Sequence, residues 1–167
     1  MRILGIDPGS EVTGYGIIET DGATHRAVLF GAIRTVARHP LHKRLLRIHE
    51  ELCAVLGREP VDAVAVEGMF HAVNVQSALR LGHARGVALL AGAQFDVPLF
   101  EYSPMEIKNA IVGYGRAEKG QVQAMVRFLL GLADVPSPAD AADALAVAIC
   151  HSHCSATRNL IAKAAQR

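Results

Sequence analysis

The stretch MRILGIDPGSEVTGYG (residues 1–16) decides the fold, because an apolar run ends in it on a carboxylate and then turns. The aliphatic residues 3–6 favour a strand, and Pro8-Gly9-Ser10 cannot continue it. Asp7 is therefore expected at the carboxyl end of the first strand. Taken alone, this acid has an ordinary interpretation as a carboxylate that caps a turn.

A second strand is expected from Val12 to Glu19, so that the turn of a hairpin lies beside Asp7. Gly14 and Gly16 remove side chains from this strand, and we expect them to let a substrate or a phosphate approach the backbone. Thr24 to Arg34 reads as a third strand, which completes a meander.

Length and composition predict one domain in a reducing compartment. We place one domain over residues 1–157 and assign residues 158–167 to a polar tail that frays after Thr157. Three cysteines cannot all pair, and no signal peptide or membrane-length apolar run is found, which predicts a cytoplasmic protein. With 17 basic against 16 acidic residues, nucleic-acid binding would need a local basic face.

An amphipathic helix is expected between Pro40 and Gly57, where apolar residues recur at steps of three and four. Lys43, Arg44 and Arg47 lie between them, and we interpret these basic residues as a solvated face.

A second acid closes a second apolar strand. Val61 to Val66 shows little alternation, as in a central strand covered on both faces, and Glu67 follows it. Ligands of open α/β sheets lie beyond the carboxyl ends of the strands. Asp7 and Glu67 therefore face one crevice if their strands are neighbours.

The next segment offers an aromatic loop and a helix with small residues. Phe70 either tucks into the core or stacks on a base. Asn74 is expected to cap a helix that runs to about Phe95. In this helix Ala78, Gly82 and Gly86 form a small-residue stripe, which either packs on the sheet or contacts a helix of another subunit.

A fifth strand is expected over residues 97–102, followed by a short helix that contains Lys108. Residues 112–120 hold three glycines and several charges, which indicates an exposed, mobile loop. Arg116 and Lys119 of this loop could contact phosphates or have no role.

The last helix carries two acids one turn apart. Residues 137–140 have the form of a capping box with proline at the first helical position, which alone could explain Asp140. Asp143 shares its face within a stripe of Ala, Leu and Val. Burial and repulsion should raise the pKa of both, so a cation is expected between them.

Farther along this helix Cys150, His153 and Cys154 share one face. We interpret them as structural, because a structural zinc site needs four ligands and the chain offers no second short-spaced pair.

Four acids thus come from two strand ends and one helix terminus: Asp7, Glu67, Asp140 and Asp143. Carboxylates suit Mg²⁺, which proteins hold through one or two of them together with substrate phosphates. Two such ions can stabilise the attacking and the leaving oxygen of phosphodiester hydrolysis. The pattern therefore indicates a metal-dependent phosphodiesterase.

The motifs resemble the RuvC family of Holliday junction resolvases, in order and with similar spacing up to about His153. The segments that carry the resemblance are GIDPGSEVTGYG, VEGMFHAVNVQSALRLGHARG, GRAEKGQVQAMV and PADAADALAVAICH. The resemblance implies a ribonuclease H-like α/β fold, with a five-stranded mixed sheet flanked by helices on both faces. It also implies a homodimer that cuts four-way DNA junctions symmetrically, in partnership with the RuvA–RuvB branch-migration machine.

Carried over residue by residue, the resemblance assigns roles to these positions. The catalytic, metal-binding tetrad falls on Asp7, Glu67, Asp140 and Asp143, with two Mg²⁺ ions implied and Mn²⁺ as a substitute. Lys119, which also counts as catalytic, and Lys108 match lysines near the scissile phosphate, and Phe70 matches an aromatic at the junction centre. The helix with Ala78, Gly82 and Gly86 matches the dimer helix.

Three rival hypotheses stay open at this point. The first is a ribonuclease H-like enzyme for another substrate, such as ribosomal RNA. An actin-like ATPase or sugar kinase would need two such domains, and 167 residues hold one. A binding module without activity would keep buried carboxylates that only cost stability.

Overall fold

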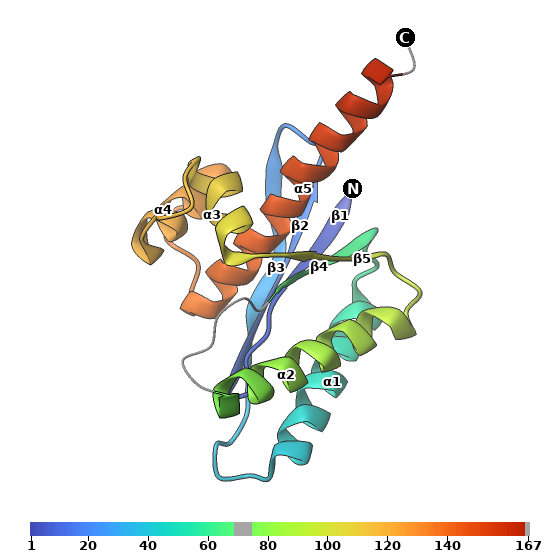
Figure 1. Cartoon of the computed structure of the whole chain (residues 1–167), viewed down its shortest axis with the longest axis vertical. Coiled ribbons are helices and arrows are strands. Elements are labelled where there is room, and N and C mark those ends of the chain that lie inside the picture. Colours follow the sequence, from blue (N-terminus) through green and yellow to red (C-terminus); the bar gives the residue numbers. More distant parts are fainter. Residues whose placement is uncertain (69–74, 166–167) are drawn as a thin grey trace.

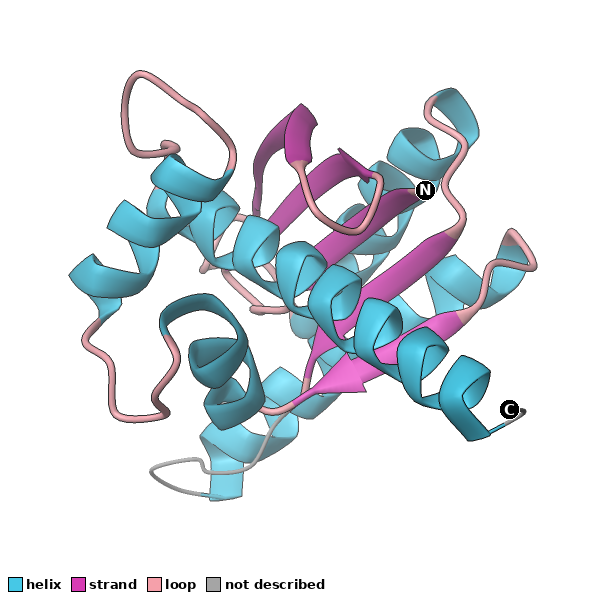
Figure 2. Ribbon diagram, turned by 90° about the horizontal axis from the view of Figure 1, so that it is seen from above, coloured by secondary structure: helices cyan, strands magenta, loops and turns pink. Residues whose placement is uncertain are grey.

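The fold is a five-stranded mixed sheet between two layers of helices (Figures 1 and 2). The computed structural model describes residues 1–68 and 75–165, without the side chains of residues 156–165. The elements in chain order are β1 (Arg2–Asp7), β2 (Val12–Thr20), β3 (His25–Arg34), α1 (Leu41–Arg58), β4 (Ala63–Glu67), α2 (Val75–Gln94), β5 (Leu99–Tyr102), α3 (Pro104–Val112), α4 (Lys119–Leu129) and α5 (Ala139–Ala165).

The strand order is β3-β2-β1-β4-β5, with β1, β2 and β3 antiparallel and with β4 and β5 parallel to β1. Ile6 pairs with Val66, so Asp7 and Glu67 follow at the same level of adjacent strands. The predicted mixed sheet is confirmed, and so is the expectation that the two acids end neighbouring strands.

The two faces of the sheet carry two separate cores. Alternation along β1 directs Leu4 and Ile6 to the side of α1 and α2, and directs Ile3 and Gly5 to the side of α5. The same period of two places Asp7 on the α5 side.

Glycines let α5 lie directly on β1 and β2. A Cβ atom on Gly5 would overlap the backbone oxygen of Ala144, and one on Gly14 would overlap that of Asp140. A Cβ on Gly16 would lie 2.7 Å from the side chain of Leu145. The prediction that Gly14 and Gly16 let a substrate or a phosphate approach the backbone is therefore wrong, because helix α5 fills the space that these glycines leave.

The small-residue stripe of α2 is turned away from the sheet. α2 packs on β4 and β5 through Ala84, Ala88 and Ala91, which are fully buried. By contrast, Cβ atoms on Gly82 and Gly86 would meet no atom of the described residues within 4 Å. Of the two interpretations of the stripe, packing on the parent sheet is wrong.

Helix α1 corrects the interpretation of one basic residue. Arg44 is only 6% exposed, whereas Lys43 and Arg47 are exposed as expected. Arg44 lies one turn before Ile48 and two before Leu52, so it belongs to the buried face of the helix. It donates hydrogen bonds to Ser10, as described below.

Helix α5 differs from the prediction at its start. It begins at Ala139, after a cis peptide bond between Ser137 and Pro138, and the predicted capping box does not form within the described residues. The helix continues to Ala165, and the fraying of the chain after Thr157 stays a prediction.

Within the described parts of the chain, no helix is long and apolar enough to cross a membrane.

Candidate active site

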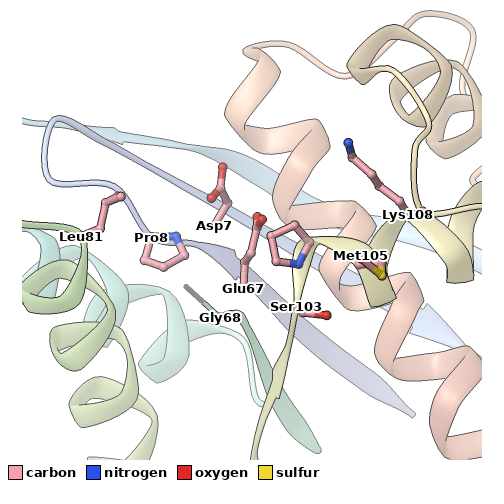
Figure 3. Close-up of a pocket in the computed structure, with 10 residues that line it drawn as sticks. Asp7, Pro8, Glu67, Gly68, Leu81, Ser103, Met105 and Lys108 are labelled. Carbon is pink, nitrogen blue, oxygen red and sulfur yellow. The ribbon is translucent and has the colours of Figure 1, made fainter. Parts of the chain in front are cut away.

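Three of the four acids meet at the carboxyl ends of β1 and β4. Asp7 and Glu67 stand side by side, with Lys108 of α3 on the far side of a proline (Figure 3). Asp143 reaches the same cleft from α5, because the glycines of β1 and β2 bring the first turns of that helix onto the sheet. The cleft has a volume of about 340 Å³, and Lys108 and Lys119 also line it.

Because the acids of this cleft are buried and repel one another, they are not all expected to be ionised at the same time. Burial, followed by the charges of Glu67, Asp143 and Asp140, raises the pKa of Asp7 to about 8. The pKa of Glu67 is raised by burial and by Asp143, while Lys119 and Lys108 oppose that rise. In the chain without a bound cation, Asp7 is therefore expected to be protonated at neutral pH.

One cation of the chain already compensates the cleft. The ammonium Nζ of Lys119 lies 2.5 Å from Oδ2 of Asp143. This hydrogen bond raises the pKa of Lys119 above its usual range. A cation was predicted between Asp140 and Asp143, and among the described residues the structure shows one only on Asp143. It belongs to Lys119, which was predicted to lie in a loop and instead begins α4.

Asp140 stands beside the cleft. It lines neither of the two cavities described here, yet its charge contributes to the raised pKa of Asp7. Its backbone is fixed against Gly14. The fourth acid is therefore within electrostatic range of Asp7 without lining either cavity.

The donor chemistry fits a hard divalent cation, although the site is not complete as it stands. Among the described side chains, no three of the His, Cys, Asp and Glu type are gathered closely enough to hold a metal ion. The carboxylates of Asp7, Glu67 and Asp143 nonetheless share one cleft, and the raised pKa values of Asp7 and Glu67 reflect burial and a repulsion that a cation would relieve. Mg²⁺ sites are commonly completed by substrate phosphates and water, which this open cleft could admit.

A larger cavity of about 660 Å³ adjoins the acids. Leu81 of α2 and Pro104 and Met105 of α3 give it apolar walls (Figure 3). Sequence analysis did not select these residues. Pro104 and Met105 follow the end of a strand, and this position could have identified them as residues that line the cavity. Nothing in the sequence indicated that Leu81 lines the same cavity as Asp7.

The remaining predicted residues are dispersed. Arg116 is exposed and lines neither cavity. Phe70 and Asn74 fall outside the described residues. His153 is held by the ring of His25, at 3.1 Å between the Nε2 atoms, and by the carbonyl of Ala110 at 3.0 Å from its Nδ1.

The decisive observation comes from comparison with known proteins. The family model described as crossover junction endodeoxyribonuclease RuvC matches residues 3–151. The chain belongs to the RuvC family. The resemblance inferred from the four motifs is thereby confirmed.

Relatives and solved structures agree over nearly the full length. The RuvC protein of Koribacter versatilis is 54% identical over 158 residues, covering 94% of this chain and 95% of that protein. The RuvC protein of Syntrophotalea carbinolica is 53% identical, covering 96% and 99%. The structure of T. thermophilus RuvC in complex with Holliday junction substrate superposes with a TM-score of 0.90 at 37% identity, covering 94% and 96%. The yeast mitochondrial Holliday junction resolvase Ydc2, at 13% identity and a TM-score of 0.64, shares the fold.

Proposed function

We propose that this chain is a structure-specific endodeoxyribonuclease that resolves four-way DNA junctions in homologous recombination and DNA repair. The observation that carries the proposal is the cleft in which Asp7, Glu67 and Asp143 meet, in a chain of the RuvC family. The 37% identical T. thermophilus protein was solved with a Holliday junction substrate, which supports the same substrate here.

In the proposed mechanism, Asp7, Glu67, Asp140 and Asp143 hold two Mg²⁺ ions, for which Mn²⁺ can substitute. Bound there, the metal would activate the attacking water and stabilise the leaving oxygen of the phosphodiester. Asp7 would hold the metal as a carboxylate, because a nearby cation would lower the pKa that burial has raised. Lys119 is poised to exchange Asp143 for a phosphate oxygen as negative charge enters the cleft.

Three further residues are proposed to contact DNA near the cut. Lys108 lines both cavities beside the acids, a position suited to the scissile phosphate. Arg116 lies in the exposed loop before α4, where it can reach a backbone phosphate. Phe70 keeps the role implied by the family, at the junction centre.

We further propose a homodimer paired through α2. The stripe of Ala78, Gly82 and Gly86 has open space at its two glycines within the described residues, and these glycines would allow two helices to approach closely. Val75 and Leu79 on the same helix are 76% and 58% exposed, which is unusual for a surface that stays in water. A two-fold axis at this helix would place two equivalent clefts for two symmetric cuts.

The proposal also includes that the protein works in the cytoplasm, together with the RuvA–RuvB machine. This part rests on family membership and on no single contact of the structure. The nuclease domain is assigned to residues 1–157, with the end of α5 as an appendage.

The test of this function is Asp143→Asn, which keeps the size of the side chain and removes one negative charge. Single-turnover cutting of a synthetic mobile junction in Mg²⁺ should fall by several orders of magnitude, because an amide is a poorer ligand for a hard cation. Junction affinity in Ca²⁺ should survive, since phosphate contacts across the dimer carry it. Cutting at the wild-type rate would contradict the four-acid assignment.

The rival nuclease hypothesis is decided by substrate choice. Wild-type protein should cut the four-way junction in preference to linear duplex DNA of the same sequence and to RNA. Equal cutting of duplex and junction would instead favour a ribonuclease H-like enzyme with another substrate.

A further inference from the structure

Positive charge is concentrated in one stretch of an otherwise acidic chain. Residues 34–49 contain five of the 17 Lys and Arg and none of the 16 Asp and Glu, together with three histidines. The chain as a whole carries +1, so the remaining residues carry 12 bases against 16 acids. A local basic face, which the net charge did not reveal, therefore exists in the connection from β3 to α1.

Most of these charges are exposed and have no partner. The side chains of Arg34, Arg38 and Lys43 make no hydrogen bond or ion pair with the residues that the structure describes. Arg47 lies one turn after Lys43 on the same helical face, and its only ion pair, with Glu51, is a long one at 4.0 Å. These four residues are called the basic surface below.

The fifth basic residue anchors this segment beside the catalytic turn. Nε and Nη2 of Arg44 donate to the carbonyl of Ser10 at 3.0 and 2.6 Å, and Nη2 also contacts its hydroxyl at 2.9 Å. Thr35 donates its N–H to the carbonyl of Glu11 at 2.9 Å. The connection from β3 to α1 is thus fastened to the turn that directly follows Asp7.

The sheet register sets the distance from the basic surface to the acids. Asp7 pairs with Gly14, which pairs with Ala32, and Arg34 ends β3 two residues farther on. Strands about 4.8 Å apart that rise about 3.3 Å per residue put the Cα atoms of Asp7 and Arg34 about 12 Å apart. The start of α1 lies at the same end of the sheet (Figure 1). One DNA strand advances about 3.4 Å per nucleotide, so this distance corresponds to about three or four nucleotides.

The start of α1 suits an anion as well. Its first turn contains no acidic residue, and its first residues follow Pro40 without a side-chain cap. The positive end of the helix dipole therefore adds to the charges of the basic surface. The acid Glu11 is 3.9 Å from Arg44, and 64% of its side chain is exposed.

We propose that the basic surface formed by Arg34, Arg38, Lys43 and Arg47 binds backbone phosphates of one duplex arm of the junction, about three to five nucleotides from the phosphate that the acids cut. The inference rests on the proposed function and extends it with a second contact region around the connection from β3 to α1. This region would set the path of the arm as it leaves the cleft.

The test removes two exposed charges, with Arg38→Ala and Lys43→Ala combined. The control combines Arg26→Ala, at the opposite end of β3, with Arg58→Ala, at the other end of α1; both residues are exposed, so charge falls equally. Junction affinity is measured in Ca²⁺ between 50 and 200 mM salt. The variant loses two phosphate contacts per protomer, and so four per proposed homodimer, which lowers the salt slope by about 3.6. The advantage of wild type over the test variant should therefore shrink about 150-fold across this range.

A chemical change in the DNA locates the contact. Junctions carry uncharged methylphosphonate linkages three to five nucleotides from the cut, on both strands of the arm. Wild type should bind such a junction more weakly than the unmodified one. The affinity of the test variant should be nearly the same for both junctions, because its substitutions have already removed the contact that the methylphosphonates remove.

Each outcome bears on the proposal separately from the function. Wild-type cutting in Mg²⁺ is measured first, and its failure would remove the function itself. With cutting intact, an unchanged salt slope, an equal loss in the control variant, or an equal methylphosphonate penalty in both proteins would overturn the arm contact. Arg38→Gln with Lys43→Gln serves as the second variant, with its melting temperature checked against wild type.

Discussion

Two groups of glycines in this chain have opposite roles. Gly5 and Gly14 lie under α5, where any side chain would overlap the helix backbone. Gly82 and Gly86 lie on α2, where a side chain would meet no atom of the described chain within 4 Å. The first group completes the fold of one protomer, and the second leaves a surface to which another helix can come close.

The difference between the two groups of glycines shows that the active site depends on helix packing as well as on the ends of strands. Asp7 and Glu67 are placed by the sheet alone, whereas Asp143 reaches them only because glycines admit the first turns of α5. The same residue type at α2 has no effect on the cleft of its own protomer.

The largest effect is expected for Gly14→Ala. Overpacking a core costs about 1–3 kcal/mol and occasionally more, and here the added methyl meets rigid backbone at Asp140, so a loss at or above about 3 kcal/mol is expected. At about 2–4 °C per kcal/mol, the melting temperature should fall by about 6–12 °C. Differential scanning calorimetry checks this, and a variant as stable as wild type would show that α5 can move away from the sheet at little cost.

A smaller effect on folding but a full effect on assembly is expected for Gly86→Leu. The exposed position has room for the side chain within one protomer, whereas the added bulk should separate two paired helices. Sedimentation should report monomers with an unchanged circular dichroism spectrum. Dimers with the wild-type concentration dependence would place the interface on another surface.

The acids that α5 gathers should make stability depend on pH and Mg²⁺. The folded pKa of Asp7, about 8, exceeds its ordinary value of 3.8, so the folded chain binds the extra proton between these values. Metal-free stability should therefore fall as pH rises from about 4 to 8 and level off above that. Mg²⁺ competes with the proton, so its stabilising effect should grow with pH, up to about 2.7 kcal/mol at one hundred times its dissociation constant.

Thermal melts with and without Mg²⁺ at several pH values measure this dependence. Asp7→Asn is the control, because it removes the titrating group and should flatten the metal-free slope. A metal-free stability that instead rises through this pH window would contradict the protonated state of Asp7.

The smallest effect is expected for Gly82→Ala, the same chemical change as at Gly14. The new methyl has open space, and replacing glycine inside a helix stabilises it by about 0.5–1 kcal/mol. The melting temperature, measured at dilutions where the chain is monomeric, should rise by about 1–4 °C. A decrease as large as that of Gly14→Ala would mean that the two groups of glycines do not differ.

Local sequence determined the elements and most of the site. The apolar runs in the sequence predicted strand ends at Asp7 and Glu67, and the pair Asp140 and Asp143 was predicted at the start of a helix. The structure has these strand ends and this helix start at those positions. This succeeded because hydrophobic period and turn chemistry act within about ten residues, where sequence is a direct guide. The family motifs added the fold and the activity.

Tertiary structure alone decided which neighbours each residue has. Nothing local distinguishes Gly14, which admits α5, from Gly82, which faces open space, because both differ from other residues only by an absent side chain. Arg44 had the helical spacing of a core residue, yet its burial depends on the carbonyl of Ser10, which arrives from a distant turn. Packing between elements distant in sequence fixes such contacts, and for that reason the pairing of Lys119 with Asp143 could be seen only in the folded chain.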